Sequence, residues 1–482
     1  MRTKKLLFII IAILPIFGFS QDGSPDLSFG INGVVQTDID DGIEIISGVA
    51  QSDNGRIIVI GTNIYETEGV KNFIIAFQEN GDIDTAFGND GVVLLEINTF
   101  EFTKVYVQSD GKILVGGGEY NQEITFIRFL EDGTEDLSFG VNGILVPFPT
   151  GESYRDLILL NNDKILTTGT ASVNGVSQAT LKQFLPNGIL DNSFGTNGIS
   201  NVQIGNQSNS VKGKIQLMEN GNIILGGRFA NSSKIVMRCL PNGSLDTSFG
   251  ANGYITIPIS EENNCFPLVF SDGSILVSCS YFDDVTKEIV KVIIKLSSDD
   301  GAMDLNFGNN GYIHANTAEL IQHNQRIIMK NSRYWYTDLI FGIRRFYANG
   351  NIDFTFQYSP NYGLLINYNF AYQNDGKIII AGTSFDFPNL NIVLQRFNND
   401  PLGIEDHPLE NLTVFPNPSK GIYNINHDFI SSETPYQITD ITGKIIQTGK
   451  LTGEQTEINL STVQSGMYLI TASGSTFRLM KN

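Results

Sequence analysis

A twelve-residue phrase that recurs along the chain most constrains the fold. Its clearest copy is DGTEDLSFGVNG, at residues 132–143. The phenylalanines of successive copies are 49 to 58 residues apart. A repeat of this period is typical of propellers and other repeat arrays. The seven phenylalanines are Phe29, Phe87, Phe139, Phe194, Phe249, Phe307 and Phe356.

Between two phrases the sequence carries signals for four short strands. A short apolar run comes first, as at 91–95, and an apolar segment that ends in a basic and an aromatic residue comes last, as at 125–129. Between them two apolar segments flank an Asp-Gly or Asn-Gly turn, which is a hairpin signal. We therefore predict an all-β chain, with a seven-bladed β-propeller over 21–402 whose ring closure removes exposed edges. A parallel β-helix is the alternative, but hairpins do not fit it.

Every phrase has an aspartate three residues before its phenylalanine, and five of seven units have a basic residue just before the strand-ending residue. This register predicts a partly buried ion pair or a turn-capping carboxylate, with a ring of calcium sites as the rival interpretation. The phenylalanine is expected to be a wedge between blades. The aspartates are Asp26, Asp84, Asp136, Asp191, Asp246, Asp304 and Asp353, and the basic residues are Arg128, Arg238, Lys295, Arg345 and Arg396.

The register also predicts how the ring closes. Arg128 precedes Asp136 by eight residues, but the residue eight positions after Arg396 is isoleucine. Asp26, conversely, has no strand before it. We therefore expect Asp26 beside Arg396, with the first phrase completing the last unit.

The phrase DGxxDxSFGxxG, alternating with VxxDGKIxVxG, resembles the delta-60 repeat family of bacterial β-propellers over residues 22–399. The resemblance implies a propeller fold. It implies no reaction, and no active-site residue is carried over from it.

The sixth unit is irregular and contains Arg333, Tyr334, Trp335 and Tyr336, with the only tryptophan of the chain. Aromatic faces beside an arginine suit a sugar or a peptide. Aromatic packing in a decayed repeat is the plainer alternative. Any specific activity is to be sought where the repeat decays, between Asn331 and Tyr372.

From residue 403 to 482 the pattern changes to six or seven short alternating strands, which predict a small β-sandwich. This segment resembles the C-terminal sorting domain of the type IX secretion system of Bacteroidota; a generic terminal adhesion domain is the alternative. The resemblance implies the secretion machinery as a partner, and a product that is released or attached to surface lipopolysaccharide. The matching residues are Phe415, Pro416, Asn417, Pro418, Gly443, Gly466 and Tyr468.

The N-terminus predicts a secretory signal peptide at residues 1–20, because Arg2, Lys4 and Lys5 precede a short apolar run. The run is short for a membrane span, so none is expected after cleavage; a retained anchor is the alternative. The location follows as secreted or at the outer-membrane surface.

A formal net charge of −20 disfavours nucleic acid and anionic membranes as partners. The sequence has no Cys/His metal spacing, and no cofactor is expected beyond the calcium alternative. Whether Cys265 and Cys279 pair stays open.

These features predict a binding, adhesion or scaffold protein without evident catalysis, whose partner is a glycan or a surface protein. An extracellular enzyme that degrades polysaccharide or protein is the alternative, with carboxylates around the propeller channel. An aspartate that recurs in every unit is more typical of structure, whereas a catalytic pair should be a local exception.

Overall fold

The chain divides into two units, Met1–Pro401 and Leu402–Asn482, and each is considered by itself. The signal peptide, Cys265, the aromatic cluster 333–336 and Gly443 lie outside the residues that the computed structural model describes. The described residues are 22–39, 42–65, 69–95, 102–117, 124–149, 151–205, 208–230, 233–257, 266–270, 272–283, 288–315, 320–323, 326–331, 342–351, 353, 356, 358, 365–384, 390–399, 412–427, 434–440, 444–451, 455–472 and 475–482.

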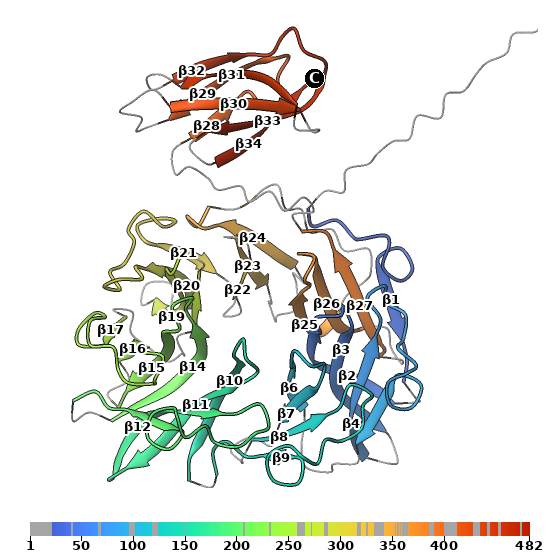
Figure 1. The fold of residues 1–482 in the computed structure, drawn as a ribbon, viewed down its shortest axis with the longest axis vertical. Helices are drawn as coiled ribbons and strands as arrows, with labels where there is room; N and C mark the ends of the chain where they lie inside the picture. Colours follow the sequence, from blue (N-terminus) through green and yellow to red (C-terminus); the bar gives the residue numbers. More distant parts are fainter. Residues whose placement is uncertain are drawn as a thin grey trace, which may run out of the picture. The chain divides into compact units, whose positions relative to one another are not determined.

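The described residues of the first unit form seven antiparallel sheets arranged around a ring (Figure 1), and no helix occurs among them. Six sheets have four strands and one has three. The all-β propeller is thereby confirmed, while the count of seven blades stays a prediction because parts of the sixth and seventh repeats lie outside the described residues.

Each sheet begins with an innermost strand, and innermost strands of neighbouring sheets contact one another, as β2 does with β6 and β25. The innermost strands are β2 (Ile43–Gln51), β6 (Phe102–Val107), β10 (Ser153–Leu159), β14 (Asn209–Leu217), β18 (Phe266–Val269), β22 (Leu320–His323) and β25 (Leu365–Tyr372). The second strands are β3 (Ile57–Tyr65), β7 (Ile113–Gly117), β11 (Ile165–Val173), β15 (Ile223–Phe229), β19 (Ile275–Asp283), β23 (Arg326–Asn331) and β26 (Ile378–Ser384).

The third strands end in the basic-aromatic pattern: β4 (Gly69–Phe77), β8 (Thr125–Phe129), β12 (Val176–Phe184), β16 (Lys234–Cys239), β20 (Glu288–Leu296), β24 (Gly342–Tyr347) and β27 (Ile392–Phe397). The outermost strands are β5 (Val92–Leu95), β9 (Ile144–Leu145), β13 (Ile199–Val202), β17 (Tyr254–Thr256), β21 (Tyr312–Ala315) and β1 (Val34–Thr37). The short apolar run after the phrase therefore forms the outer edge in six of the described sheets.

The second and third strands are buried along nearly their whole length, as in 57–63 of β3 and 72–77 of β4. A sheet that packs against a neighbour on each face buries both sets of side chains, so these strands lose the alternation of a half-exposed sheet. The core is accordingly divided among the joints between sheets.

The ring closes through strands from the two ends of the unit. β1 pairs with β27 in antiparallel register, with Val34 opposite Gln395 and Thr37 opposite Ile392. The first phrase thus supplies the outer strand of the last sheet, as the closure argument predicts.

Two edges of the ring differ in their connections. On one edge, which we call the phrase face, the phrases between third and outermost strands are 14 residues long at 78–91, 130–143, 185–198 and 240–253. The other edge, which we call the crossover face, carries the connections between second and third strands and between successive sheets. There the connections between second and third strands range from two residues (174–175) to ten (332–341).

The second unit contains two sheets, in the orders β28-β29-β32 and β31-β30-β33-β34. They enclose a core that includes Tyr423, Ile438 and Leu479, as expected for a small sandwich. The strands are β28 (Leu412–Phe415), β29 (Ile422–His427), β30 (Thr434–Asp440), β31 (Ile445–Leu451), β32 (Gln455–Asn459), β33 (Gly466–Ala472) and β34 (Ser475–Lys481).

Candidate functional site

The phenylalanine of each phrase lies in the joint between two sheets. Phe87, for example, is fully buried in one cluster with Ile58 of the first sheet and Val115 of the second. Phe249 likewise joins Ile224 of the fourth sheet to Val277 of the fifth. Burying a large aromatic side chain between sheets stabilises the joint through apolar contact on both of its faces.

An arginine and an aspartate complete the joint, as Arg238 shows between the fourth and fifth sheets. Its Nε donates to Asp246 Oδ2 at 2.8 Å, and its Nη1 donates to the carbonyl of Ser298 in the next sheet's phrase. The guanidinium carbon lies 4.5 Å from the ring centroid of Phe249. One side chain therefore binds the aspartate, stacks on the wedge and spans the joint.

Three other joints repeat this arrangement. Nε of the arginine donates to Oδ2 of the aspartate at 2.9 Å for Arg128 and Asp136, 2.7 Å for Arg345 and Asp353, and 2.7 Å for Arg396 and Asp26. The acceptors across the joint are the carbonyls of Pro186 and Glu79 for Arg128 and Arg396, and Asn399 Oδ1 for Arg345.

The pair of Arg396 and Asp26 is the contact that ring closure predicts. Burial by itself would raise the pKa of Asp26, but hydrogen bonds from Ser28 and the charge of Arg396 outweigh it and lower the pKa to about 2. For Asp136 and Asp246, hydrogen bonds from the serine two residues on and the arginine likewise outweigh burial and lower the pKa. These three carboxylates stay ionised at neutral pH.

A backbone hydrogen bond also crosses most joints. The glycine after the wedge donates its N–H to the carbonyl of the first residue of the next phrase. Gly140 shows why a glycine stands there: its φ is 55°, and a Cβ would lie 2.1 Å from the carbonyl oxygen of Ile144. The bonds run from Gly30 to Asn80, Gly88 to Asp132, Gly140 to Asn187, Gly250 to Asp300 and Gly308 to Asn349.

In the first and third sheets the sequence lacks a basic residue before the strand-ending phenylalanine, and the cation comes from elsewhere. Arg56, just before β3, lies 2.7 Å from Asp84 Oδ2 and donates to the carbonyl of Glu131 across the joint. Lys164, just before β11, donates to Asp191 Oδ2 at 2.7 Å. Sequence reasoning missed both, although the absence of a basic residue at Ala76 and Gln183 was a signal to look for a substitute.

The fifth sheet differs again. Lys295 Nζ lies 3.9 Å from Asp272 Oδ2 and donates to the carbonyl of Ala348 at 3.4 Å. Asp304 caps its own turn by accepting the backbone N–H of Asn306 at 3.0 Å. The predicted basic residue therefore spans the joint here, while the phrase aspartate serves the turn.

The calcium interpretation finds no arrangement of ligands in the described part of the chain. There, no group of three or more His, Cys, Asp or Glu side chains is placed to hold a metal ion. Cys239 is a free thiol, and burial raises its pKa to about 12. The pairing of Cys265 and Cys279 lies outside the described side chains.

A different carboxyl lies on the crossover face at the start of β2. Glu44 is fully buried, and burial, followed by the nearby charge of Asp38, raises its pKa to about 7. Asn63 Nδ2 donates to Glu44 Oε1 at 3.2 Å, and Thr383 Oγ1 of the last sheet donates to the Glu44 carbonyl at 2.9 Å. Glu44 is thus a buried carboxyl outside the repeated phrase, and it lies beside the joint between the first and last sheets, where the ring closes.

In the second unit the predicted sorting motif holds the last strand. The Asn417 side chain donates to the carbonyl of Arg478 at 2.6 Å and accepts the N–H of Met480 at 2.8 Å. The peptide bonds before Pro416 and Pro418 are cis, and Phe415 is 44% exposed. Tyr468 is buried and donates to the carbonyl of Gln464, while Gly466 begins β33.

The comparisons with known proteins divide the chain in the same way. Residues 413–482 match the family described as "Secretion system C-terminal sorting domain". Residues 108–139, 160–194, 219–249 and 373–400 match "Domain of unknown function (DUF5122) beta-propeller". The chain is therefore a propeller-repeat protein with a type IX secretion system sorting tail, which marks it for the cell surface or the exterior.

No curated protein matches the chain. Among solved structures, it resembles PorZ, an essential surface component of the type IX secretion system of Porphyromonas gingivalis, with 11% identity and a TM-score of 0.40 over 92% of this chain. It spans 61% of the length of that protein.

Two further solved structures are similar to the chain at 9% identity. The polysaccharide lyase Uly1 matches with a TM-score of 0.46 over 77% of this chain and 92% of its own. The β-propeller domain of the Trilobed protease from Pyrococcus furiosus matches with a TM-score of 0.41 over 75% and 98%. In the described part of this chain no helix is long and apolar enough to cross a membrane.

Proposed function

We propose that the chain is an exported binding or scaffold module whose ligand surface is the crossover face of the propeller. The observation that carries the proposal is the contrast in connection length within one repeat. Phrase connections are 14 residues long in four successive sheets, whereas the crossover connections between second and third strands range from two residues to ten. Variable loops on a rigid scaffold are where binding specificity is most often built.

The repeated aspartates support this assignment because their carboxylates are already engaged in contacts within the protein. At the joints described above, their carboxylates accept hydrogen bonds from arginine or lysine and from nearby serines. These groups lie on the phrase face and hold sheets together. A ligand surface built from the crossover connections leaves them undisturbed.

The longest crossover connection, 332–341, contains the predicted aromatic cluster and joins β23 to β24. Trp335 is the single tryptophan of the chain, so its fluorescence reports on this connection alone. We expect one class of glycan on an array of surface polysaccharide fragments to bind the full chain and to change this fluorescence saturably. Trp335→Ala should weaken binding of the glycan by tenfold or more, since stacking on an aromatic ring contributes about 1–3 kcal/mol. Trp335→Phe is the conservative comparison, because it keeps an aromatic face.

A matched control uses the opposite face. Leu137 is 67% exposed on the phrase face, and Leu137→Ala should bind the same glycan with unchanged affinity. Equal loss of binding in both variants would contradict a crossover-face site. If no glycan binds, the chain is tested for capture of a surface protein. Capture by the wild type that is lost in Trp335→Ala would indicate that the ligand of the crossover face is a protein.

The second candidate is an extracellular polysaccharide- or protein-degrading enzyme, and Glu44 with Asp38 is the local exception that it requires. Glu44 is fully buried and hydrogen-bonded to Asn63, however, whereas a general acid must reach the substrate. We therefore favour binding. Release of reducing ends or peptides from surface polymers by the wild type, abolished in Glu44→Gln, would reverse this preference.

A further inference from the structure

The joint between the third and fourth sheets departs from the repeat in two ways. Gln183 stands where four other third strands have arginine, and its Nε2 donates to Asp191 Oδ2 at 2.9 Å without spanning the joint. Among the described residues, no backbone hydrogen bond links Gly195 to Asn242; the Ser200 hydroxyl instead donates to the carbonyl of Gly243 at 2.7 Å. The two sheets are therefore less tightly joined on the phrase face.

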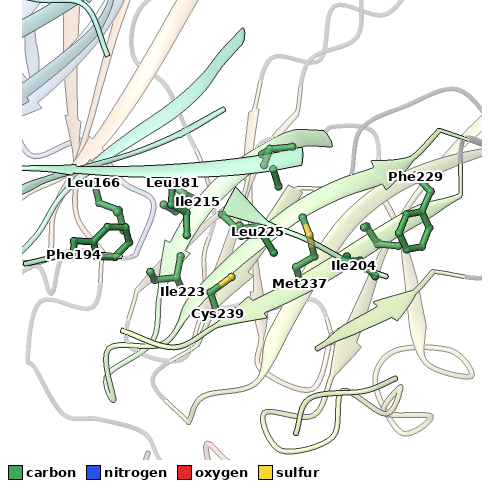
Figure 2. Close-up of a cluster of buried hydrophobic side chains, with 14 residues drawn as sticks. Leu166, Leu181, Phe194, Ile204, Ile215, Ile223, Leu225, Phe229, Met237 and Cys239 are labelled. Carbon is green, nitrogen blue, oxygen red and sulfur yellow. The ribbon is translucent and has the colours of Figure 1, made fainter. Parts of the chain in front are cut away.

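A cavity of about 760 Å³ lies at this joint, within the range of small-ligand sites. Gln183 and Pro241 both line it, and these are the positions that an arginine links at other joints, as Arg128 links its own strand to the Pro186 carbonyl. Leu166, Ile215 and Ile223 line its apolar wall, and Figure 2 shows these three side chains in the cluster between the sheets. The cavity occupies the place of the missing arginine.

Lys164, which supplies the cation at this joint, does not occupy the place of the missing arginine. Lys164 Nζ donates to Asp191 Oδ2, and no hydrogen bond among the described residues connects Lys164 to the carbonyl of Pro241. In the first sheet the corresponding Arg56 does span its joint, because it reaches the carbonyl of Glu131. At the joint between the third and fourth sheets, Lys164 therefore compensates the charge of Asp191, while the carbonyl of Pro241 stays an available acceptor across the joint.

We propose that this cavity binds an arginine side chain presented by a partner peptide. The three-carbon stem would lie against Leu160, Leu217 and Met218, which also line the cavity, and the guanidinium would reach the Pro241 carbonyl and the Glu219 carboxylate at the rim. A net charge of −20 favours approach of a cationic peptide. The site lies on the phrase face and is independent of a glycan surface on the crossover face.

The test uses the purified full chain and Nα-acetyl-arginine amide as the probe, with Nα-acetyl-citrulline amide as the neutral control of the same shape. By titration calorimetry we expect one site per chain with a dissociation constant on the order of 1 mM, and at least tenfold weaker binding of the citrulline compound. No saturable binding at about 10 mM probe, or equal binding of both compounds, would overturn the proposal.

Two variants locate the site. Gln183→Arg restores the repeat and should close the cavity, so that probe binding falls more than tenfold while the unfolding midpoint rises. Glu219→Gln changes an exposed rim residue and should weaken binding about threefold to fivefold without changing the unfolding midpoint. Wild-type affinity in a folded Gln183→Arg variant would place the probe elsewhere and refute the assignment.

Discussion

The phrase face and the crossover face of the propeller are built from the same strands, yet the phrase face is regular from sheet to sheet and the crossover face is variable. On the phrase face, the connection has the same length in four successive sheets, and most joints contain the same wedge, carboxylate and cation. On the crossover face, connections vary in length, and the buried carboxyl that stands out, Glu44, has no counterpart in the phrase. The comparison indicates that repetition here marks the parts that hold sheets together.

It follows that departures from the repeat are the places to look for function. The third-to-fourth joint departs on the phrase face, where a glutamine replaces an arginine. The sixth repeat departs on the crossover face, where the connection is longest. Variants that remove a repeated part should change stability, whereas variants at a departure should change binding.

The largest effect is expected at ring closure. Arg396→Ala removes a guanidinium that binds Asp26, Ser28 and the Glu79 carbonyl, and leaves Asp26 buried with Lys377 as its cationic neighbour among the described residues. Removing one partner of a buried pair costs about 3–5 kcal/mol, so we expect a loss near 4 kcal/mol in urea unfolding of the full chain. Increased proteolysis near residue 22 should accompany it.

Arg128→Ala is the matched control, because it breaks the same pair at a joint whose two sheets remain connected by the chain. We expect a smaller loss, about 3 kcal/mol, and no new cleavage at the N-terminus. If Arg396→Ala cost less than about 1 kcal/mol, the pair would not hold the ring closed and the comparison of joints would fail.

The relocated cation of the first sheet gives the next largest effect. Arg56→Ala should destabilise the chain by about 2 kcal/mol, because Asp84 loses its cation and the Glu131 carbonyl loses the Arg56 donor. Ala76→Arg in the same chain restores the basic residue to the position used at other joints, and we expect it to recover most of the loss. A double-mutant cycle measures the recovery. Simple additivity of the two changes would show that the positions do not substitute for each other.

Glu44 predicts a pH dependence of the opposite sign to that of Asp26. The folded-state pKa of Glu44, about 7, lies above its ordinary value of 4.5, so its contribution to stability falls as the pH rises from about 4.5 to 7. Asp26 contributes above pH 4 and loses that contribution as the pH falls toward 2. Unfolding between pH 5 and 8 therefore leaves out the contribution of Asp26, and comparison with a Glu44 variant assigns the change to Glu44.

Glu44→Gln removes the titration while Oε1 can still accept from Asn63. We expect the variant to be more stable than the wild type at pH 8, by on the order of 2 kcal/mol, and equal to it near pH 4.5. The same difference at both pH values would mean that Glu44 is not protonated in the folded chain.

Much of the phrase face could be predicted from the sequence, because local order there repeats. The eight-residue offset between Arg128 and Asp136 was enough to predict the pair of Asp26 with Arg396, residues 370 positions apart. The wedge was predicted from the spacing of phenylalanines. In both cases the same side chains meet at successive joints, so one copy explains the others.

What could not be predicted depends on contacts between sheets. The cations at Arg56 and Lys164 come from a hairpin next to the carboxylate in space, 20 and 19 residues before the expected positions Ala76 and Gln183. The raised pKa of Glu44 depends on burial beneath Asn63 and the last sheet. The cavity at Gln183 appears only when two sheets are placed side by side.

The smallest effect is expected at phrase positions that vary between copies. Leu137 and Val141 are 67% and 76% exposed, and the second phrase has Thr85 and Asn89 in their places. Because neither side chain contributes to the buried joint, Leu137→Thr should change the free energy of unfolding by less than about 0.5 kcal/mol, against about 3–5 kcal/mol for Phe139→Ala two residues on. Urea unfolding of the two variants compares them directly. A loss above about 1 kcal/mol in Leu137→Thr would mean that the variable positions also hold the ring, and that repetition alone does not identify its structural parts.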